Sequence, residues 1–544
     1  MLFSQSVVNS VHNLSVTGPG TVKAVSETEI CIFCHTPHDS KPSSPLWNKE
    51  DPGMAYVLYS SSTAQGVPGQ PDGSSVLCLS CHDGTIALGN VLSRTEDILF
   101  AGGVTRMPAG RSNLTTDLSD DHPVSFVYNA ALAASDGQLR DPASVMHPVV
   151  IEGGKVQCRS CHDPHNNIYP DFLVASNQFS GLCISCHDVS FWSSSSHSTS
   201  TASWNGAGTD PWYHTPFTTV AENGCENCHN THGAGGRGRL MNYQAEESNC
   251  LNCHNGNVAS TNISAELTKP YLHNVSGYNL SHDAAETLPP SVMHVECEDC
   301  HNPHAVTNVA AAAPAAKGFN YGVRGINQTG SPVNPVQFED EICYKCHADS
   351  PLKPASHTLR QIEQNNVRLE FDLSSASYHP VTGVGKNTDS PSLIAPAYTE
   401  TSIIYCTDCH ASNGSGTPAG PHGSIYPTLL KYRYLKADNT PESASSYELC
   451  YSCHNRASIL SDNSFSFHYK HISEENTPCN VCHDPHGISS AQGSTVNNSH
   501  LINFDISIVG SAGSGFLRFV DTGINSGYCL LRCHGKTHTF SMPY

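Results

Sequence analysis

Cysteine and histidine are the residues of this chain whose types and spacing could do chemistry. The chain has 24 cysteines and 32 histidines in 544 residues. Twelve motifs, each with two cysteines followed at once by a histidine, use all 24 cysteines. Eleven are Cys-x-x-Cys-His, and the twelfth, Cys529-Leu-Leu-Arg-Cys533-His534, is one residue longer. The cysteine pairs are Cys31 and Cys34, Cys78 and Cys81, Cys158 and Cys161, Cys183 and Cys186, Cys225 and Cys228, Cys250 and Cys253, Cys297 and Cys300, Cys343 and Cys346, Cys406 and Cys409, Cys450 and Cys453, Cys479 and Cys482, and Cys529 and Cys533.

This spacing predicts covalent attachment of c-type haem. Residues i, i+3 and i+4 share one face of a helical turn, so two thiols can bond one edge of a macrocycle. The imidazole that follows the second thiol then lies under the iron as its ligand. We therefore predict twelve haem c groups, with the motif histidines as iron ligands: His35, His82, His162, His187, His229, His254, His301, His347, His410, His454, His483 and His534. The longer twelfth motif needs a wound or bulged turn.

Zinc sites and disulfides are the alternative interpretations of so many cysteines. Zinc sites built from Cys-x-x-Cys commonly use two such pairs for each metal and do not require a histidine beside the second cysteine. A disulfide framework would not place a histidine after every second cysteine. The regular Cys-His step, repeated twelve times, favours haem.

The composition predicts that the haems themselves form the core. Only 38% of the residues are hydrophobic, and there are 34 prolines and 42 glycines. About 45 residues for each motif is too little chain to bury an ordinary apolar core. Such a composition is also typical of disorder, which the density of cofactors would override. We expect a mostly irregular coil with short α-helices at the haem motifs and a few β-hairpins, one of them within 501–520.

The motifs fall into six pairs, which predicts a modular array of six di-haem units. The first member of most pairs has a tail with a second histidine three residues after the motif histidine, as in His162-Asp-Pro-His165. That histidine lies on the same side of its own haem as the motif histidine, so it can ligate only a neighbouring iron. The proline between them stops the turn. The expected units are 1–110, 111–205, 206–270, 271–360, 361–460 and 461–544.

The 20 histidines outside the motifs exceed the twelve needed as second axial ligands, so bis-histidine iron is expected throughout. The second axial ligands are predicted to be the tail histidines, the histidines upstream of the pairs, and two further histidines in the last third of the chain. His282, His294, His471, His500 and His538 stay open, and His197, His273 and His357 are expected to be spare. The predicted second ligands are His38, His165, His232, His304 and His486 from the tails, His12, His122, His147, His214 and His379 upstream, and His422 and His468.

The charge balance and hydropathy exclude several functions. The formal net charge is −21, which argues against nucleic acid and anionic membranes as partners. No run approaches the ~18 apolar residues of a membrane span. The opening Met1-Leu-Phe-Ser-Gln5 lacks the basic and apolar regions of a secretory signal. We expect the numbering to begin near a mature terminus, or a leader to have been omitted.

The Cys-x-x-Cys-His-x-Pro-His tails, each followed by another Cys-x-x-Cys-His, resemble the doubled-motif multihaem c-type cytochromes. The chain looks most like large secreted and outer-surface cytochromes of metal-reducing bacteria, some of which polymerise into extracellular nanowires. The resemblance implies export to the cell surface or beyond, with the periplasm as the alternative. It also implies partners that are other copies of the chain or other multihaem cytochromes, and extracellular electron acceptors.

The resulting hypothesis is a dodecahaem electron conduit for extracellular electron transfer, plausibly a filament subunit and not a catalyst. A multihaem reductase of a small oxidant, or a monomeric periplasmic carrier or store, is the alternative. A reductase would need one iron with an open ligand position and nearby acid–base groups. No motif here replaces its histidine by lysine, as such enzymes often do.

Overall fold

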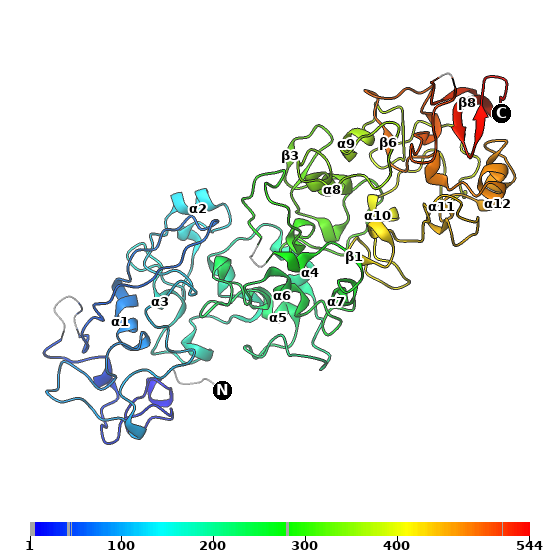
Figure 1. The fold of residues 1–544 in the computed structure, drawn as a ribbon. Coiled ribbons are helices and arrows are strands. Elements are labelled where there is room, and N and C mark those ends of the chain that lie inside the picture. The colour runs from blue at the N-terminus through cyan, green and yellow to red at the C-terminus, as the bar shows by residue number, and fades with distance from the viewer. Residues whose placement is uncertain (1–5, 41–43, 45, 279–281, 514) are drawn as a thin grey trace. The chain divides into compact units, whose positions relative to one another are not determined.

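The fold is known from a computed structural model, which describes residues 6–40, 44, 46–278, 282–513 and 515–544. Most of the chain is irregular coil around short helices (Figure 1). The helices are α1 (Gly73–His82), α2 (Ala130–Asp136), α3 (Cys158–Cys161), α4 (Ser196–Thr199), α5 (Val220–Asn223), α6 (Glu246–Leu251), α7 (Ile263–Glu266), α8 (Glu339–His347), α9 (Val367–Glu370), α10 (Cys406–Cys409), α11 (Glu448–Tyr451) and α12 (Arg456–Leu460). This arrangement confirms the predicted fold class. The opening residues 1–5, considered above as a possible leader remnant, lie outside the described residues.

Eleven of the motifs lie on helical turns, because the Cys-x-x-Cys spacing suits one turn. Six of these turns belong to α1, α3, α6, α8, α10 and α11. The others are 3-10 turns, namely η2 (Cys31–Phe33), η7 (Cys183–Ser185), η9 (Gly224–Asn227), η12 (Cys297–Asp299) and η16 (Cys479–Val481). In most of them the amide of the motif histidine donates to the carbonyl of the first cysteine, as His162 does to Cys158 at 3.0 Å. This bond closes the turn and fixes the histidine beside both thiols.

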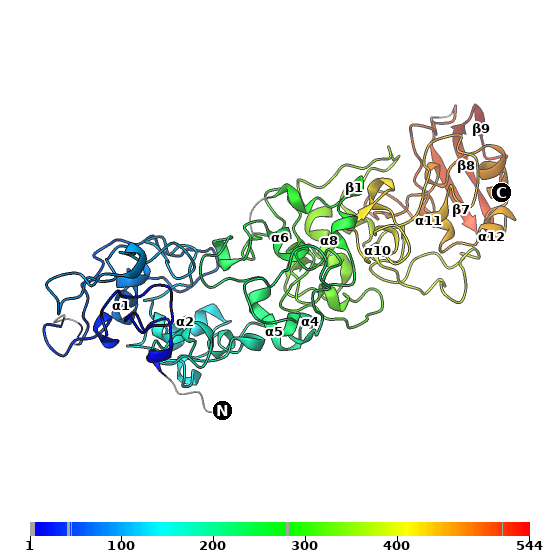
Figure 2. The same cartoon turned by 90° about the horizontal axis from the view of Figure 1, so that it is seen from below.

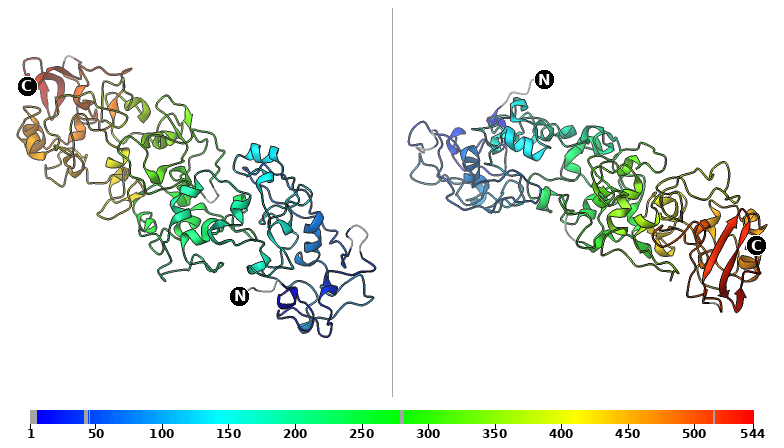
Figure 3. Two further views of the ribbon diagram at one scale, coloured as in Figure 1. Left: turned by 180° about the vertical axis from the view of Figure 1, so that it is seen from behind. Right: turned by 90° about the horizontal axis from the view of Figure 1, so that it is seen from above.

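The strands are short and antiparallel. They are β1 (Tyr271–Leu272), β2 (Gly325–Ile326), β3 (Pro332–Val333), β4 (Ser377–Tyr378), β5 (Gly423–Ser424), β6 (Gly487–Ile488), β7 (Arg518–Gly523), β8 (Ser526–Cys533) and β9 (Lys536–His538). The first six form three two-stranded pairs, β1 with β5, β2 with β3 and β4 with β6. The last three form one sheet in the order β7-β8-β9, seen in red in Figure 3.

This C-terminal sheet corrects two expectations. The hairpin predicted within 501–520 is wrong, because the described part of 501–517 contains no strand and the sheet occupies 518–538. The wound or bulged turn predicted for the twelfth motif is also wrong, because Cys529 and Cys533 lie on strand β8. Phe519, Val520, Thr522 and Tyr528 are residues that favour strands, and Ile524 and Asn525 form the turn between β7 and β8. This composition was the available strand signal.

The chain divides into two compact units. The first contains 1–253 and 279–285, and the second contains 254–278 and 286–544. Within the first unit, α4 and α5 lie side by side (Figure 2). Each unit holds six of the cysteine pairs. The finer division into six di-haem units stays a prediction. Among the described residues, none of the helices is long and apolar enough to cross a membrane.

The apolar core is divided into small clusters. The largest has six buried residues, among them Val481, Phe504 and Leu531, and several clusters have only three. Cysteines of the motifs pack against many of these clusters, as Cys34 and Cys81 do beside Phe33. The polypeptide exposes 26,505 Å², whereas a compact chain of 58.3 kDa would expose about 19,000 Å². The polypeptide thus exposes more surface than a compact chain of its mass. A fold built around large groups held by the motifs would have this property.

Candidate haem sites

Six motif histidines hold one ring nitrogen in a hydrogen bond to a backbone carbonyl. Their Nδ1 atoms lie 2.6–2.9 Å from the carbonyl oxygens, and a carbonyl can only accept, so Nδ1 carries the proton. The lone pair then resides on Nε2, the atom that can bind iron. The six bonds join His82 to Ser112, His162 to Asp171, His229 to Arg239, His301 to Phe319, His410 to Thr428 and His483 to His500.

Four of the accepting carbonyls belong to a repeated turn that sequence reasoning missed. Asp171, Arg239, Thr428 and His500 have φ between 54° and 62°, and the residue after each also has a positive φ. This left-handed conformation costs free energy for residues other than glycine, so it is kept where the surrounding structure requires it. Here the turn brings its carbonyl under the motif histidine. The repeated leucine or phenylalanine 10 to 19 residues after the motif histidine was the available sequence signal.

Among the described residues, eight motif histidines are seen to face a second imidazole. The pairs and the distances between their ring centroids are His12–His82 (6.1 Å), His35–His165 (6.0 Å), His122–His187 (6.3 Å), His162–His232 (6.2 Å), His273–His347 (6.3 Å), His301–His422 (6.1 Å), His410–His486 (6.2 Å) and His468–His483 (6.4 Å). Two imidazoles that bind one metal from opposite sides place their centroids about 6.3 Å apart, because each metal–nitrogen bond is about 2 Å long. The pairs therefore have the separation that an iron between them requires.

The pairs follow a simple order along the chain. The motif histidine that opens a pair faces the tail histidine of the next pair, as His35 faces His165 and His410 faces His486. His483, which opens the last pair, is the exception, because it faces His468 upstream. The second motif histidine of a pair faces a histidine upstream of that same pair, as His82 faces His12. Each histidine that follows a motif thus reaches a neighbouring site, as the tail geometry requires.

Burial lowers the pKa of several of these imidazoles. Burial, followed by the charge of the neighbouring His82, lowers the pKa of His12 to about 4. Burial and the facing His273 lower the pKa of His347 to about 4 in the same way. Burial, followed by the charges of His379 and His483, lowers the pKa of His454 to about 4. Neutral imidazoles have a free nitrogen lone pair at neutral pH, as metal ligands must.

The thiols of successive motifs lie close together within each unit. In the first unit, contact with the Cys78 thiol lowers the pKa of Cys158 to about 7, and contact with Cys183 does so for Cys225. In the second unit, Cys343 contacts Cys406 and Cys450 contacts Cys479. The first cysteine of a pair's second motif thus meets the first cysteine of the next pair. Neighbouring attachment sites in the sequence are therefore neighbours in space.

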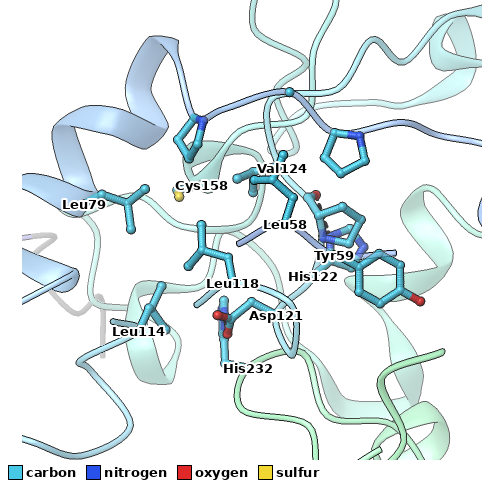
Figure 4. A pocket seen from close by; sticks show the side chains of 14 residues that line it. Leu58, Tyr59, Leu79, Leu114, Leu118, Asp121, His122, Val124, Cys158 and His232 are labelled. Atoms are coloured by element: carbon cyan, nitrogen blue, oxygen red, sulfur yellow. Dashed lines mark hydrogen bonds and ion pairs between the residues drawn. The ribbon is translucent and has the colours of Figure 1, made fainter. Parts of the chain in front are cut away.

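A cavity in the first unit fits the edge of a large apolar group. It measures about 440 Å³ including its open mouth, and Leu58, Leu79 and Leu118 line it. The Cys158 thiol and the His232 ring line the same cavity (Figure 4). His122 also lines this cavity, so an apolar wall, one motif thiol and two imidazoles meet there, as a covalently bound haem would need.

Two tail histidines are fixed by buried carboxylates. The Nδ1 atom of His232 lies 3.0 Å from a carboxylate oxygen of Asp121, and that of His486 lies 3.0 Å from Glu370. Burial alone would lower the pKa of His486, but the hydrogen bond and charge of Glu370 outweigh it and raise that pKa. A carboxylate in this position fixes the ring and increases its basicity as a ligand.

Several predicted ligands are not brought to a motif histidine. The rings of His38 and His147 are exposed, and neither makes a hydrogen bond, ion pair or ring contact with the described residues. His214 directs Nε2 to the Glu226 carbonyl at 3.3 Å. His304 stays a prediction.

Two histidines behave differently from their expected roles. His273, expected to be spare, faces His347. Its position 24 residues before Cys297 resembles that of His379 before Cys406, which was the missed signal. The motif histidine His534 points its Nε2 to the Asp438 carboxylate at 2.9 Å.

The motif arrangement matches a known family. Residues 147–190, 214–259 and 399–458 match the family described as "Doubled CXXCH motif". With the facing imidazoles, this match decides the class. The chain is a multihaem c-type cytochrome. The paired Cys-x-x-Cys-His motifs of the cytochrome indicate covalently bound haem c.

The cytochrome is also similar to two curated proteins. Both are named C-type polyheme cytochrome OmcB, from Geobacter sulfurreducens strains DL-1 / KN400 and ATCC 51573 / DSM 12127 / PCA. Each is 26% identical to the cytochrome over 246 residues, which cover 38% of its chain and 32% of the relative. The cytochrome thus matches about a third of the length of these relatives.

Proposed function

We propose that the protein conducts electrons through twelve haem c groups, each ligated by two histidines, for extracellular electron transfer. The observation that carries this proposal is the set of facing imidazoles, eight of which join one motif to a histidine elsewhere in the chain. The thiol contacts between Cys78 and Cys158, and between Cys343 and Cys406, support an order of sites that follows the sequence. An ordered set of closely spaced sites is what conduction requires.

The residues around each site determine what it can do. Bound haem c supplies an iron that accepts and releases one electron. Two imidazoles at each site leave no position for a substrate, which favours electron transfer over catalysis. The carbonyl and carboxylate partners of Nδ1 hold the imidazoles in place. A fixed ligand set needs little rearrangement when the charge changes.

Protein-film voltammetry tests the proposed function. The holoprotein on an electrode should take up and release about twelve electrons reversibly. Nitrite or hydroxylamine should produce no catalytic current, because every site already has two protein ligands. A catalytic current with either oxidant would contradict the conduit and favour the reductase. If only the haems nearest to the electrode exchanged electrons with it, conduction along the chain would be contradicted.

We propose that the protein works outside the cytoplasm, at the cell surface or beyond it. The charge of −21 supports a protein that stays apart from nucleic acid and anionic membranes. Its partners would be further multihaem cytochromes and extracellular electron acceptors. The periplasm is the alternative, and protease treatment of whole cells distinguishes the two. Digestion of the protein by added protease supports the surface location, and full protection contradicts it.

We also propose that copies of the chain join into a filament. The support is His38, a tail histidine, whose position predicts that it ligates a neighbouring iron and not the iron of its own motif. Its ring is exposed and makes no contact with the described residues, so it is available to a neighbouring copy. Negative-stain images of concentrated holoprotein should show fibres, and His38→Ala should shorten or abolish them. The exposed His147→Ala is the control. Particles of single-chain mass at every concentration would contradict the filament and leave the conduit intact.

A further inference from the structure

The twelfth motif differs from the others in its backbone. Cys529 and Cys533 lie on β8, where Phe519 of β7 pairs with Cys529 and Lys536 of β9 pairs with Cys533. Successive side chains of a strand point to opposite faces, so residues an even number of positions apart share a face. Cys529, Leu531 and Cys533 therefore share one face. The extra residue of this motif is what a strand needs, because a spacing of three would direct the two thiols to opposite faces.

Both thiols face the preceding site. Leu531 belongs to the buried cluster of Val481 and Phe519, and Cys529, Cys533 and Cys482 pack against that cluster. Cys482, the second cysteine of the eleventh motif, has its pKa raised by burial and then by Cys529 and Cys533. Cys34 is raised in the same way by burial and then by Cys81, the second cysteine of its partner motif. The strand thus places its two thiols close to a thiol of the preceding motif, as Cys81 is close to Cys34.

The motif histidine does not share this face. His534 and Gly535, with φ of 47° and 78°, are the two central residues of the tight turn between β8 and β9. Two successive positive φ values are typical of a type I′ hairpin turn. His534 follows Cys533 directly, so its ring leaves the strand on the other side. Its Nε2 lies 2.9 Å and 3.2 Å from the two carboxylate oxygens of Asp438, which occupies the nitrogen that the other motif histidines keep for iron.

One other imidazole lies at the thiol face, and a second imidazole lies beside it. His538 is on β9 and pairs with Leu531, and directly opposed residues of an antiparallel pair share a face. Its ring centroid lies 6.1 Å from that of His471, the separation found in the other eight pairs. His471 belongs to the π-helical turn η15 (Lys470–Glu474), and its Nδ1 donates to the Phe467 carbonyl at 2.7 Å. Its Nε2 is therefore free to bind a metal.

We infer that His471 and His538 are the axial ligands of the haem bound by Cys529 and Cys533, and that His534 is a turn residue paired with Asp438. This inference rests on the haem binding in the proposed function but concerns one site only. It assigns the twelfth site a ligand set in which neither histidine follows the second cysteine directly. It also explains why the motif is longer than the other eleven.

Single variants of the full holoprotein test this assignment. Intact mass counts the bound haems, and electron paramagnetic resonance with near-infrared magnetic circular dichroism reports spin state and ligands. His538→Ala and His471→Ala should each keep the haem count and convert about one haem in twelve from low-spin to high-spin. His534→Gln should leave every bound haem low-spin. His357→Ala, which removes an exposed histidine, is the control and should change nothing.

The opposite outcomes overturn the assignment. If His538→Ala and His471→Ala stay entirely low-spin, these histidines are not the ligands. If His534→Gln keeps its haem count and gains one high-spin haem, His534 is a ligand. If His534→Gln loses one haem, the motif histidine is needed for attachment, and the spin states of His538→Ala and His471→Ala decide the ligation. None of these results depends on conduction, so failure in voltammetry would contradict the proposed function and leave the ligand assignment standing.

Discussion

Replacing His486 by alanine is expected to open one iron site in the middle of the second unit. His486 faces His410 at 6.2 Å, so the site of Cys406 and Cys409 would lose one of its two imidazoles. The expected result is one high-spin haem and a binding site for cyanide or carbon monoxide, because a five-coordinate iron accepts such ligands. The reduction potential of that site should rise by on the order of 100 mV or more, since axial ligands set haem potentials over about 0.8 V. Spectroelectrochemical titration measures both changes.

A second variant separates ligation from tuning at the same site. Glu370→Gln removes the charge that His486 contacts at 3.0 Å but keeps a side chain of similar size. The site should stay low-spin, and its potential should rise by roughly 60 mV, which corresponds to a tenfold weaker preference for ferric iron. His147→Ala is the control and should leave every haem unchanged. A low-spin His486→Ala, or a high-spin His147→Ala, would show that the ligands are assigned wrongly.

Replacing Arg360 by methionine is expected to destabilise the last part of the second unit strongly. The Arg360 guanidinium donates to the carbonyls of Asn480, Asn503 and His483 at 2.6–3.0 Å and lies 3.5 Å from Asp484. The arginine and aspartate side chains are 6% and 10% exposed, so the change leaves a buried carboxylate without its cationic partner. Breaking such a pair costs about 3–5 kcal/mol.

Hydrogen exchange measures this effect on the holoprotein without assuming a single unfolding transition. Amides of 479–505 that exchange through opening of this region should exchange about two to three orders of magnitude faster in Arg360→Met, because each factor of ten equals about 1.4 kcal/mol. Arg237→Met is the control, since its pair with Asp117 is 58% and 40% exposed and should contribute less than about 1 kcal/mol. Equal protection in the two variants would contradict a structural role for Arg360.

Local sequence patterns predicted the parts of this fold that are built from adjacent residues. The Cys-x-x-Cys-His spacing placed eleven motifs on helical turns, as the structure has them. The tail argument predicted that His165 and its equivalents reach a different site from their own motif. The structure brings His165 to His35, which is 130 residues away in the sequence.

Seven of the eight imidazoles that face a motif histidine in the described part of the chain were among the predicted second ligands. The motif that each of them faces could not be predicted, because the two histidines come from distant segments of chain. His301 faces His422 and His162 faces His232, and no periodicity joins these positions. Proximity to a motif was a poor guide, since His147 and His214 precede their motifs by 11 residues and face no motif histidine in the described part of the chain. The order of pairing along the chain, visible in the structure, was the information that sequence spacing alone lacked.

The twelfth motif shows why one extra residue matters. On a helical turn it would separate the thiols, and on strand β8 it brings Cys529 and Cys533 to one face. A wound or bulged turn was predicted for the twelfth motif by analogy with the other eleven. The strand pattern of Arg518–Cys533 was available but was assigned to the wrong segment.

The central claim is that all twelve motifs bind haem covalently and that each iron has two histidine ligands. Intact mass of the purified protein, with electron paramagnetic resonance of the same sample, tests it most directly. The purified protein should have the mass of the polypeptide plus twelve haems, and its resonance spectrum should contain only low-spin ferric signals. A mass that matches the bare polypeptide, or twelve haems with several high-spin signals, would contradict it.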